Sequence, residues 1–260
     1  QKKKTDPKVN AELESKVMTF FYKKVKGREL SNFYEVEINI PDSSGKMRSF
    51  SNGELAFHGM KYIEIGYQIS ATESPTAAER SAKLIEFGER FEKSGEFGQL
   101  TGAQAKSKGG KKHGIEMSQQ EIGMWSASRD EVQYKISQYK FDTYSEVREV
   151  LESSGDKILI HPAARDGDDK MEKVYWEGRA KLIQSESGEN EIHILGENRL
   201  GNIWMDIRNK LTAKPITTTP VIQKSTLIST SISTPSVYTP TPTHSQTTQI
   251  ATPAITPLRE

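Results

Sequence analysis

The chain contains 260 residues, of which 34% are hydrophobic, and its 36 Lys and Arg side chains nearly balance 35 Asp and Glu. This balance argues against an overall basic surface for nucleic acid, and the absence of cysteine excludes a disulfide framework, thiolate metal sites and a Cys nucleophile. The five histidines lack HxH or HExxH spacing, so we expect no metal site, and we expect no cofactor. No apolar run reaches the roughly 18–20 residues of a membrane span, so we expect no membrane segment. The protein is expected to be monomeric, intracellular and cytoplasmic.

The composition divides the chain into three parts. Residues 1–16 are charged and polar and are expected to form a flexible or weakly helical lead-in. Residues 17–212 carry nearly all of the aromatic side chains and are long enough to bury a sizeable core. In residues 213–260, Thr, Ser and Pro dominate, so this segment cannot offset the entropy of ordering, roughly 1–2 kcal/mol per residue, and we expect a disordered tail.

Two kinds of pattern predict strands in the first fifty residues. Val17–Tyr22 is a short β-branched and aromatic run. Glu35–Ile40 alternates polar and apolar residues, as a half-buried strand does. The turn-forming segment Pro41–Gly45 follows, and Lys46–Phe50 is expected to return as the partner strand of a hairpin.

Helical periodicity dominates the middle of the chain. A helix is expected from Asn52 to about Gly66, with Ser51 or Asn52 as its N-cap. Further helices are expected at Thr76–Lys93, Ser118–Phe141 and Tyr144–Glu152. Between the first two of these, Gly95–Gly114 is expected to be a loop with a short helical piece.

The last part of the domain mixes strands and one helix. Lys157–His161 has the pattern of a buried strand, and Arg165–Lys170 that of a charged turn. Val174–Trp176 is expected to be extended and to pair with Glu189–Leu195. A final amphipathic helix should span Asn198–Leu211, with one apolar face made of Leu200, Ile203, Trp204, Ile207 and Leu211. The fold class is therefore α+β, mainly helical with a small N-terminal β-sheet.

The helix that follows Asn52 carries the first group of candidate site residues. Glu54, His58 and Lys61 stand at i, i+4 and i+7, so they share one helix face. This spacing also occurs on ordinary solvated faces. If the face lines a cleft, a carboxylate there suits an oxocarbenium-like centre, and a buried lysine amine suits attack on a sugar carbon.

Two further groups have both a structural and a functional interpretation. Trp125 and Trp176 either fill the core or stack on a base or nicotinamide-like ring. The segment Gly196–Gly201 opens the last helix, where backbone N–H groups bind phosphate readily. Asn198 and Arg199 would add donors there, although Asn is also a common N-cap.

Five short motifs in order resemble the NADAR family of YbiA-like N-glycosidases over about residues 17–211. They are LSNFY at Leu30–Tyr34, GELAFHGMKY at Gly53–Tyr62, Trp125 with Lys140–Phe141, VYWEG at Val174–Gly178, and GENRLGNIWMDIRNKL at 196–211. In the second motif His58 stands where the family usually has Gln. Each motif is common alone, but their shared order is specific.

The resemblance implies cleavage of an N-glycosidic bond at ribose C1, without a metal. The implied substrates are ADP-ribose attached to guanine in nucleic acid, or a free nucleotide-sugar such as an early phosphorylated intermediate of riboflavin synthesis. Glu54 would be the acid/base or cation-stabilising carboxylate, Lys61 an amine able to form a Schiff base, and Trp125 a stacking platform. The implied substrate-positioning residues are Asn32, Phe33, His58, Trp176, Asn198, Arg199 and Gly201.

The chain departs from the family pattern at further places, where the segment Pro162–Met171 looks inserted and Glu177 replaces a Gly. Lys173 stands where the family usually has Asp, three residues before the Trp of its Y-W-G segment, so Glu172 is the candidate substitute carboxylate. Gly53 replaces the Ser that normally caps the Glu54 helix. These departures leave two alternatives open: an inactive module that binds NAD-like or ADP-ribose-like ligands, and an interaction protein that uses the fold as a scaffold.

Overall fold

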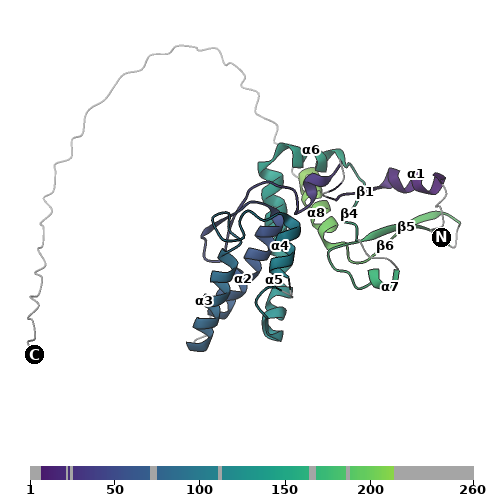
Figure 1. Cartoon of the computed structure of the whole chain (residues 1–260). Helices are drawn as coiled ribbons and strands as arrows, with labels where there is room; N and C mark the ends of the chain where they lie inside the picture. Colours follow the sequence, from purple (N-terminus) through teal and green to yellow (C-terminus); the bar gives the residue numbers. More distant parts are fainter. Residues whose placement is uncertain are drawn as a thin grey trace, which may run out of the picture. The chain divides into compact units, whose positions relative to one another are not determined.

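The computed structural model describes residues 7–21, 23, 26–70, 75–110, 113–163, 168–185 and 188–213 (Figure 1). All of them belong to one compact unit, Gln1–Pro215. The expected lead-in is helical from Pro7 to Lys16, as helix α1, and its first six residues lie outside the described part. The expected tail also lies outside the described residues from position 214 onward.

Helices make up most of the described unit and confirm a mainly helical α+β fold. After α1 they are a 3-10 turn η1 (Arg28–Leu30), α2 (Gly53–Ser70), α3 (Pro75–Glu89), α4 (Gly102–Gly109), α5 (Gln119–Thr143), α6 (Ser145–Ser153), α7 (Asp168–Met171) and α8 (Arg199–Ala213). The helices predicted from periodicity are all present, with ends that differ by a few residues. Asp168–Lys170, expected to be part of a turn, instead belongs to α7.

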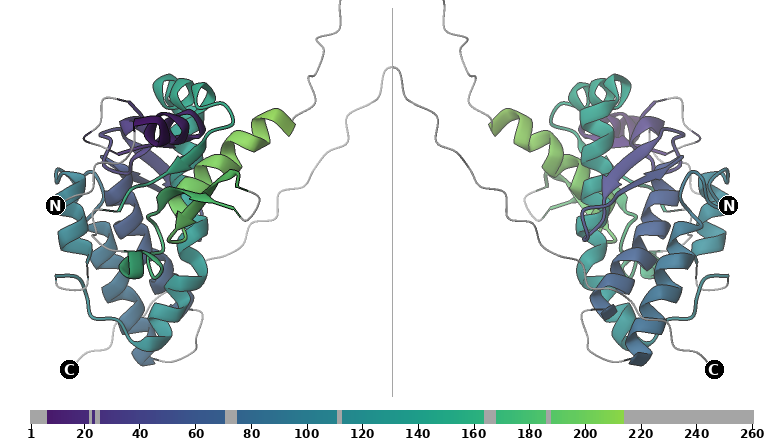
Figure 2. Two further views of the ribbon diagram at one scale, coloured as in Figure 1. Left: turned by 90° about the vertical axis from the view of Figure 1, so that its right-hand side faces the viewer. Right: turned by 90° about the vertical axis from the view of Figure 1, so that its left-hand side faces the viewer.

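Helix α2 is the centre of the larger hydrophobic core. It packs against α3, α4 and α5, and Figures 1 and 2 show α2, α3 and α5 side by side. The core residues it contributes, all fully or almost fully buried, are Leu55, Ala56, Met60, Tyr62, Ile63 and Ile65. Gly59 and Gly88 lie where α2 and α3 cross, because a Cβ on Gly88 would sit only 2.7 Å from the Gly59 carbonyl oxygen.

A second core lies between α8, α6 and the end of α5. The apolar face predicted for the last helix is confirmed: Leu200, Ile203, Trp204 and Ile207 are buried there, and Leu211 packs against them. The indole of Trp204 also donates to the Leu30 carbonyl at 2.9 Å. This hydrogen bond holds α8 against the turn η1, whose last residue, Leu30, is the first residue of the LSNFY motif.

The strands in the described part of the chain form three two-stranded sheets. In the first, β1 (Val17–Thr19) pairs in parallel with β4 (Ile158–Ile160). In the second, β2 (Ile38–Pro41) and β3 (Met47–Phe50) form the predicted hairpin. In the third, β5 (Arg179–Gln184) pairs antiparallel with β6 (Asn190–Leu195), with Arg179 opposite Leu195.

The third sheet corrects the expectation that Glu189–Leu195 pairs with Val174–Trp176. The partner is β5, while 174–176 is irregular and hydrogen-bonds to the start of α8. The reason is the turn length: only a few residues separate β5 from β6, so a hairpin closes with little loss of loop entropy. In the part of the chain that the structure describes, no helix is long and apolar enough to cross a membrane.

Candidate functional site

A cavity of about 700 Å³ opens beside the first turns of α2, and we call it the Glu54 cavity. Its walls come from Phe21 and the LSNFY segment, from α2, α4 and α5, from the residues that follow β4, from residues 173–177, and from the start of α8. The predicted site residues that line it are Asn32, Phe33, Glu54, His58 and Trp176. Four of the five family-like motifs therefore supply or flank one recess.

Glu54 is placed by the way α2 begins. The Asn52 side chain accepts from the Leu55 N–H at 2.9 Å, so Asn52 provides the N-terminal cap. The backbone N–H of Glu54 donates to the Asn32 carbonyl at 3.1 Å. Gly53 permits this approach, because a Cβ there would lie 3.0 Å from Asn32 Oδ1. Asn52 and Asn32 together provide the anchoring that was expected from a capping Ser at position 53.

Glu54 and His58 face each other inside the cavity. Glu54 Oε1 lies 3.3 Å from His58 Nε2, and each residue is 8% exposed. Both ring nitrogens of His58 are buried without a hydrogen-bond partner among the described residues. The ring is also confined, because a Cβ on Gly109 would fall 2.3 Å from its Cγ. Unpaired nitrogens in a wall of the cavity are available to a ligand that enters it.

Lys61 lies behind the wall of the cavity and is not among the residues that line it. Its Nζ donates to the Gly109 carbonyl at 2.6 Å and lies 4.3 Å from the centroid of the Tyr62 ring. Burial lowers the pKa of Lys61 to about 8, and the negative charge of Glu54 opposes this lowering. The amine therefore has an accessible neutral form, but it must leave the Gly109 carbonyl to reach the cavity.

Asn32 and Phe33 form the wall beside the start of α2. The Asn32 amide exchanges two hydrogen bonds with the Gln133 amide, at 2.7 and 3.0 Å. Phe33 packs against Gly102, where a Cβ would come within 2.6 Å of the phenyl ring. The two hydrogen bonds between the amides join the LSNFY motif to α5 and fix the directions of the Asn32 and Gln133 side chains.

Aromatic rings cover one side of the cavity. Phe57 makes edge contacts with Trp125 and Trp176, with ring centroids 5.1 and 5.3 Å apart. Trp176 lines the cavity, and Phe57 both packs against the larger core and lines the cavity. Trp125 does not line the cavity; it supports Phe57 from behind.

His161 is a cavity residue that the sequence analysis did not select. It follows β4, its ring stacks on Phe20 at 5.4 Å, and its Nδ1 is buried without a partner among the described residues. Burial, with the positive charge of Lys106 adding to it, lowers the pKa of His161 to about 4, so the ring is neutral at pH 7. The sequence signal was its place at the carboxyl end of a predicted buried strand.

The start of α8 holds β4, and its Leu200 lines the cavity, whereas Asn198, Arg199 and Gly201 do not. Asn198, at φ 47°, donates to the Leu159 carbonyl at 2.8 Å and accepts from the His161 N–H at 3.1 Å. A Cβ on Gly201 would lie 2.1 Å from the Leu159 oxygen. Arg199 forms an ion pair with Asp130 at 2.6 Å. Asn198 and Gly201 thus position the strand that carries His161.

The charges around the cavity are unevenly distributed. Glu172 is exposed and is not among the lining residues, whereas the adjacent Lys173 lines the cavity. Lys106, on α4, is a second exposed cation that lines it. The cavity therefore has the buried carboxylate of Glu54 in its wall, together with the exposed cations Lys106 and Lys173 and the half-buried carboxylate of Glu177. No group of three or more His, Asp or Glu side chains suited to a metal ion occurs among the described residues.

Comparison with known proteins places the chain in a family. The model of the NADAR domain matches residues 20–212, well over half of the chain. A search of curated proteins returned no matching relative. The matched range includes every residue of the Glu54 cavity described above. The chain belongs to the NADAR domain family.

Proposed function

We propose that the chain is an N-glycosidase that hydrolyses the bond between ribose C1 and a base nitrogen, releasing ADP-ribose from guanine. Membership of the NADAR family supports N-glycosidase-like chemistry in general. The observation that carries the proposal is the carboxylate of Glu54. It is almost fully buried, it lines a cavity of about 700 Å³, and its carboxylate accepts no hydrogen bond from the other described residues.

The reaction makes a positive charge develop on the sugar. As the C1–N bond breaks, its electron pair leaves with the base, and water adds to C1 and loses a proton. Glu54 is the group placed to stabilise the oxocarbenium-like centre or to accept that proton. Neutral His161 and the ring of His58 supply hydrogen bonds to the sugar or the base, because His161 Nδ1 and both His58 nitrogens are buried without a partner among the described residues.

Lys61 provides a second route to the same bond cleavage. Its lowered pKa leaves a usable fraction of neutral amine near pH 8. That amine would attack C1 of the ring-opened ribose, and the bond from C1 to the base nitrogen would break as the base takes a proton and leaves. The Schiff base that remains is later hydrolysed by water to lysine and sugar. The route requires the bond between Lys61 and the Gly109 carbonyl to break first.

The cavity walls suit a nucleotide. Its volume lies within the range of about 300–1,000 Å³ usual for small-molecule sites. Phe33, Phe57 and Trp176 offer ring faces and edges for a base. Lys106 and Lys173 offer positive charge for the diphosphate.

The direct test is release of ADP-ribose from ADP-ribosylated guanosine, followed by chromatography. We expect turnover by the parent chain and loss of at least about a hundredfold for Glu54→Gln, with binding of ADP-ribose retained. Glu79→Gln, an exposed position on α3, is the matched control. Full activity of Glu54→Gln would refute the assignment. Trapping of the parent with borohydride, compared with Lys61→Ala, tests the Schiff base.

One alternative has its own structural support. Lys173 contributes a cation to the cavity at the position where the family pattern has Asp, and the amine of Lys61 is bonded to a backbone carbonyl. Both features favour a module that binds ADP-ribose without cleaving it. In that case ADP-ribose would raise the melting temperature while no base is released from any N-glycoside, including intermediates of riboflavin synthesis.

A further inference from the structure

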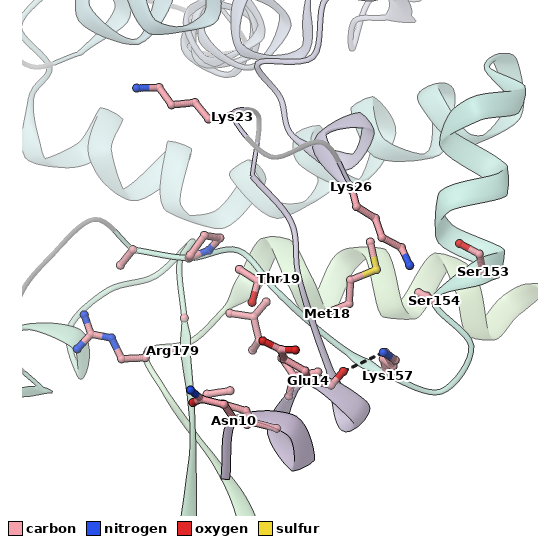
Figure 3. Close-up of a pocket in the computed structure, with 17 residues that line it drawn as sticks. Asn10, Glu14, Met18, Thr19, Lys23, Lys26, Ser153, Ser154, Lys157 and Arg179 are labelled. Carbon is pink, nitrogen blue, oxygen red and sulfur yellow. Dashed lines mark hydrogen bonds between the residues drawn. The ribbon is translucent and has the colours of Figure 1, made fainter. Parts of the chain in front are cut away.

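A second cavity, of about 800 Å³, lies next to the Glu54 cavity and carries a different set of charges (Figure 3). We call it the basic cavity. Its charged lining residues in the described part of the chain are four cations, Lys23, Lys26, Lys157 and Arg179, and one carboxylate, Glu14. The whole protein is almost neutral, so this excess of positive charge is local.

The two cavities share a wall. Pro162 lines both, and its bridge to Gly178 runs between them. On one side His161 and Trp176 face the Glu54 cavity. On the other side the same two segments continue into the basic cavity, and Gly178 N–H donates to the His161 carbonyl at 2.7 Å. The two cavities therefore adjoin at Pro162.

The cations differ in how they are held. Lys157 Nζ donates to the Glu14 backbone carbonyl at 2.8 Å, which fixes the ammonium at the cavity edge (Figure 3). Figure 3 shows the amine of Lys26 pointing toward the end of the cavity where Ser154 lies, whereas Lys23 points away. Neither Lys26 nor Lys157 has a carboxylate partner within the described ranges. Among the described residues, therefore, no carboxylate neutralises either charge.

We propose that the basic cavity binds backbone phosphates of a nucleic-acid strand whose modified base occupies the Glu54 cavity. The inference rests on the proposed function and selects a polynucleotide over a free nucleotide as its substrate. A free ADP-ribosylated nucleotide ends within or at the rim of the first cavity. A strand continues beyond its reacting residue, and each phosphate that meets a Lys releases condensed counterions.

The test is fluorescence anisotropy of an unmodified single-stranded oligonucleotide against salt concentration. The variant Lys26→Gln/Lys157→Gln removes two cations, and Lys83→Gln/Lys135→Gln, outside both cavities, is the matched control. For two lost phosphate contacts, the slope of log affinity against log salt should fall in magnitude by about 1.4. The control should keep the parent slope. Thermal melts check that both variants are folded.

The outcomes separate this inference from the proposed function, because binding of the unmodified strand needs no turnover. A parent that does not bind the oligonucleotide at low salt, or a double variant with the parent slope, overturns it. With an active enzyme, the variant should raise KM severalfold for a modified oligonucleotide and leave kcat/KM for ADP-ribosylated guanosine unchanged. Equal losses on both substrates would make the basic cavity part of the nucleotide site and refute the strand assignment.

Discussion

Replacement of Lys61 by Met should stabilise the protein at neutral pH. Lowering the Lys61 pKa from 10.5 to about 8 corresponds to about 3 kcal/mol, at 1.36 kcal/mol per pKa unit. Below pH 8 the lysine is charged in both states, so the folded state carries this full cost. Met fills a similar volume without charge, but it loses the bond to Gly109, about 1 kcal/mol, while Tyr62 still donates to that carbonyl. The expected net gain is about 2 kcal/mol.

The sign of the pH dependence follows from proton linkage. Between pH 8 and 10.5 the unfolded state binds more protons at this lysine, so the wild type gains stability as pH rises. The advantage of Lys61→Met should therefore shrink from about 2 kcal/mol at pH 6.5 to near zero at pH 9.5. Urea unfolding at the two pH values measures it, with exposed Lys83→Met as the control. A gain independent of pH, or a loss at pH 6.5, would refute the assigned burial cost.

Two further predictions concern the cavity walls. Trp176→Ala should weaken binding of ADP-ribose by about 1–3 kcal/mol, measured by calorimetry, because a stacking surface is removed. An unchanged affinity would place the base elsewhere. His161→Phe keeps the stack on Phe20 and removes the unpartnered Nδ1, so stability should hold or rise while kcat/KM falls at least tenfold. Because the pKa of His161 is near 4, titration of His161 should not change the wild-type rate between pH 5 and 8. Full activity of His161→Phe would exclude contact between His161 and the substrate.

Local patterns predicted the helices because each buries one face with regular spacing. The cap at Asn52 and the buried face of α8 followed from the same rules. Strand β5 was missed because its residues are half-exposed or exposed along its length, so no alternation marks it. The parallel pairing of β1 with β4 joins Val17 to Ile158, a distance in sequence that no local pattern encodes.

The sequence predicted which helices and strands carry the site residues, but it predicted only some of the contacts between those residues. Helical spacing correctly put Glu54 and His58 together, since i and i+4 share a face. The same spacing cannot show that the Lys61 amine turns to Gly109, which comes 48 residues later in the chain. His161 reaches the cavity only because Asn198 and Gly178 bond to its backbone from distant segments. A lone histidine after a strand carries no sign of such partners.

Two lysines, the part-buried Lys61 and the buried Lys140, hold backbone carbonyls at or next to the lining of the Glu54 cavity. Lys61 bonds to Gly109, next to the lining residue Gly110, and Lys140 bonds to the carbonyl of lining residue Ser31 at 2.8 Å. Burial lowers the pKa of Lys140 to about 7, as it lowers that of Lys61. Apolar residues at both places would avoid these costs, but they would leave the two carbonyls with fewer donors. The cavity walls are therefore held by specific bonds at the expense of stability, which is expected where geometry at a site matters more than packing.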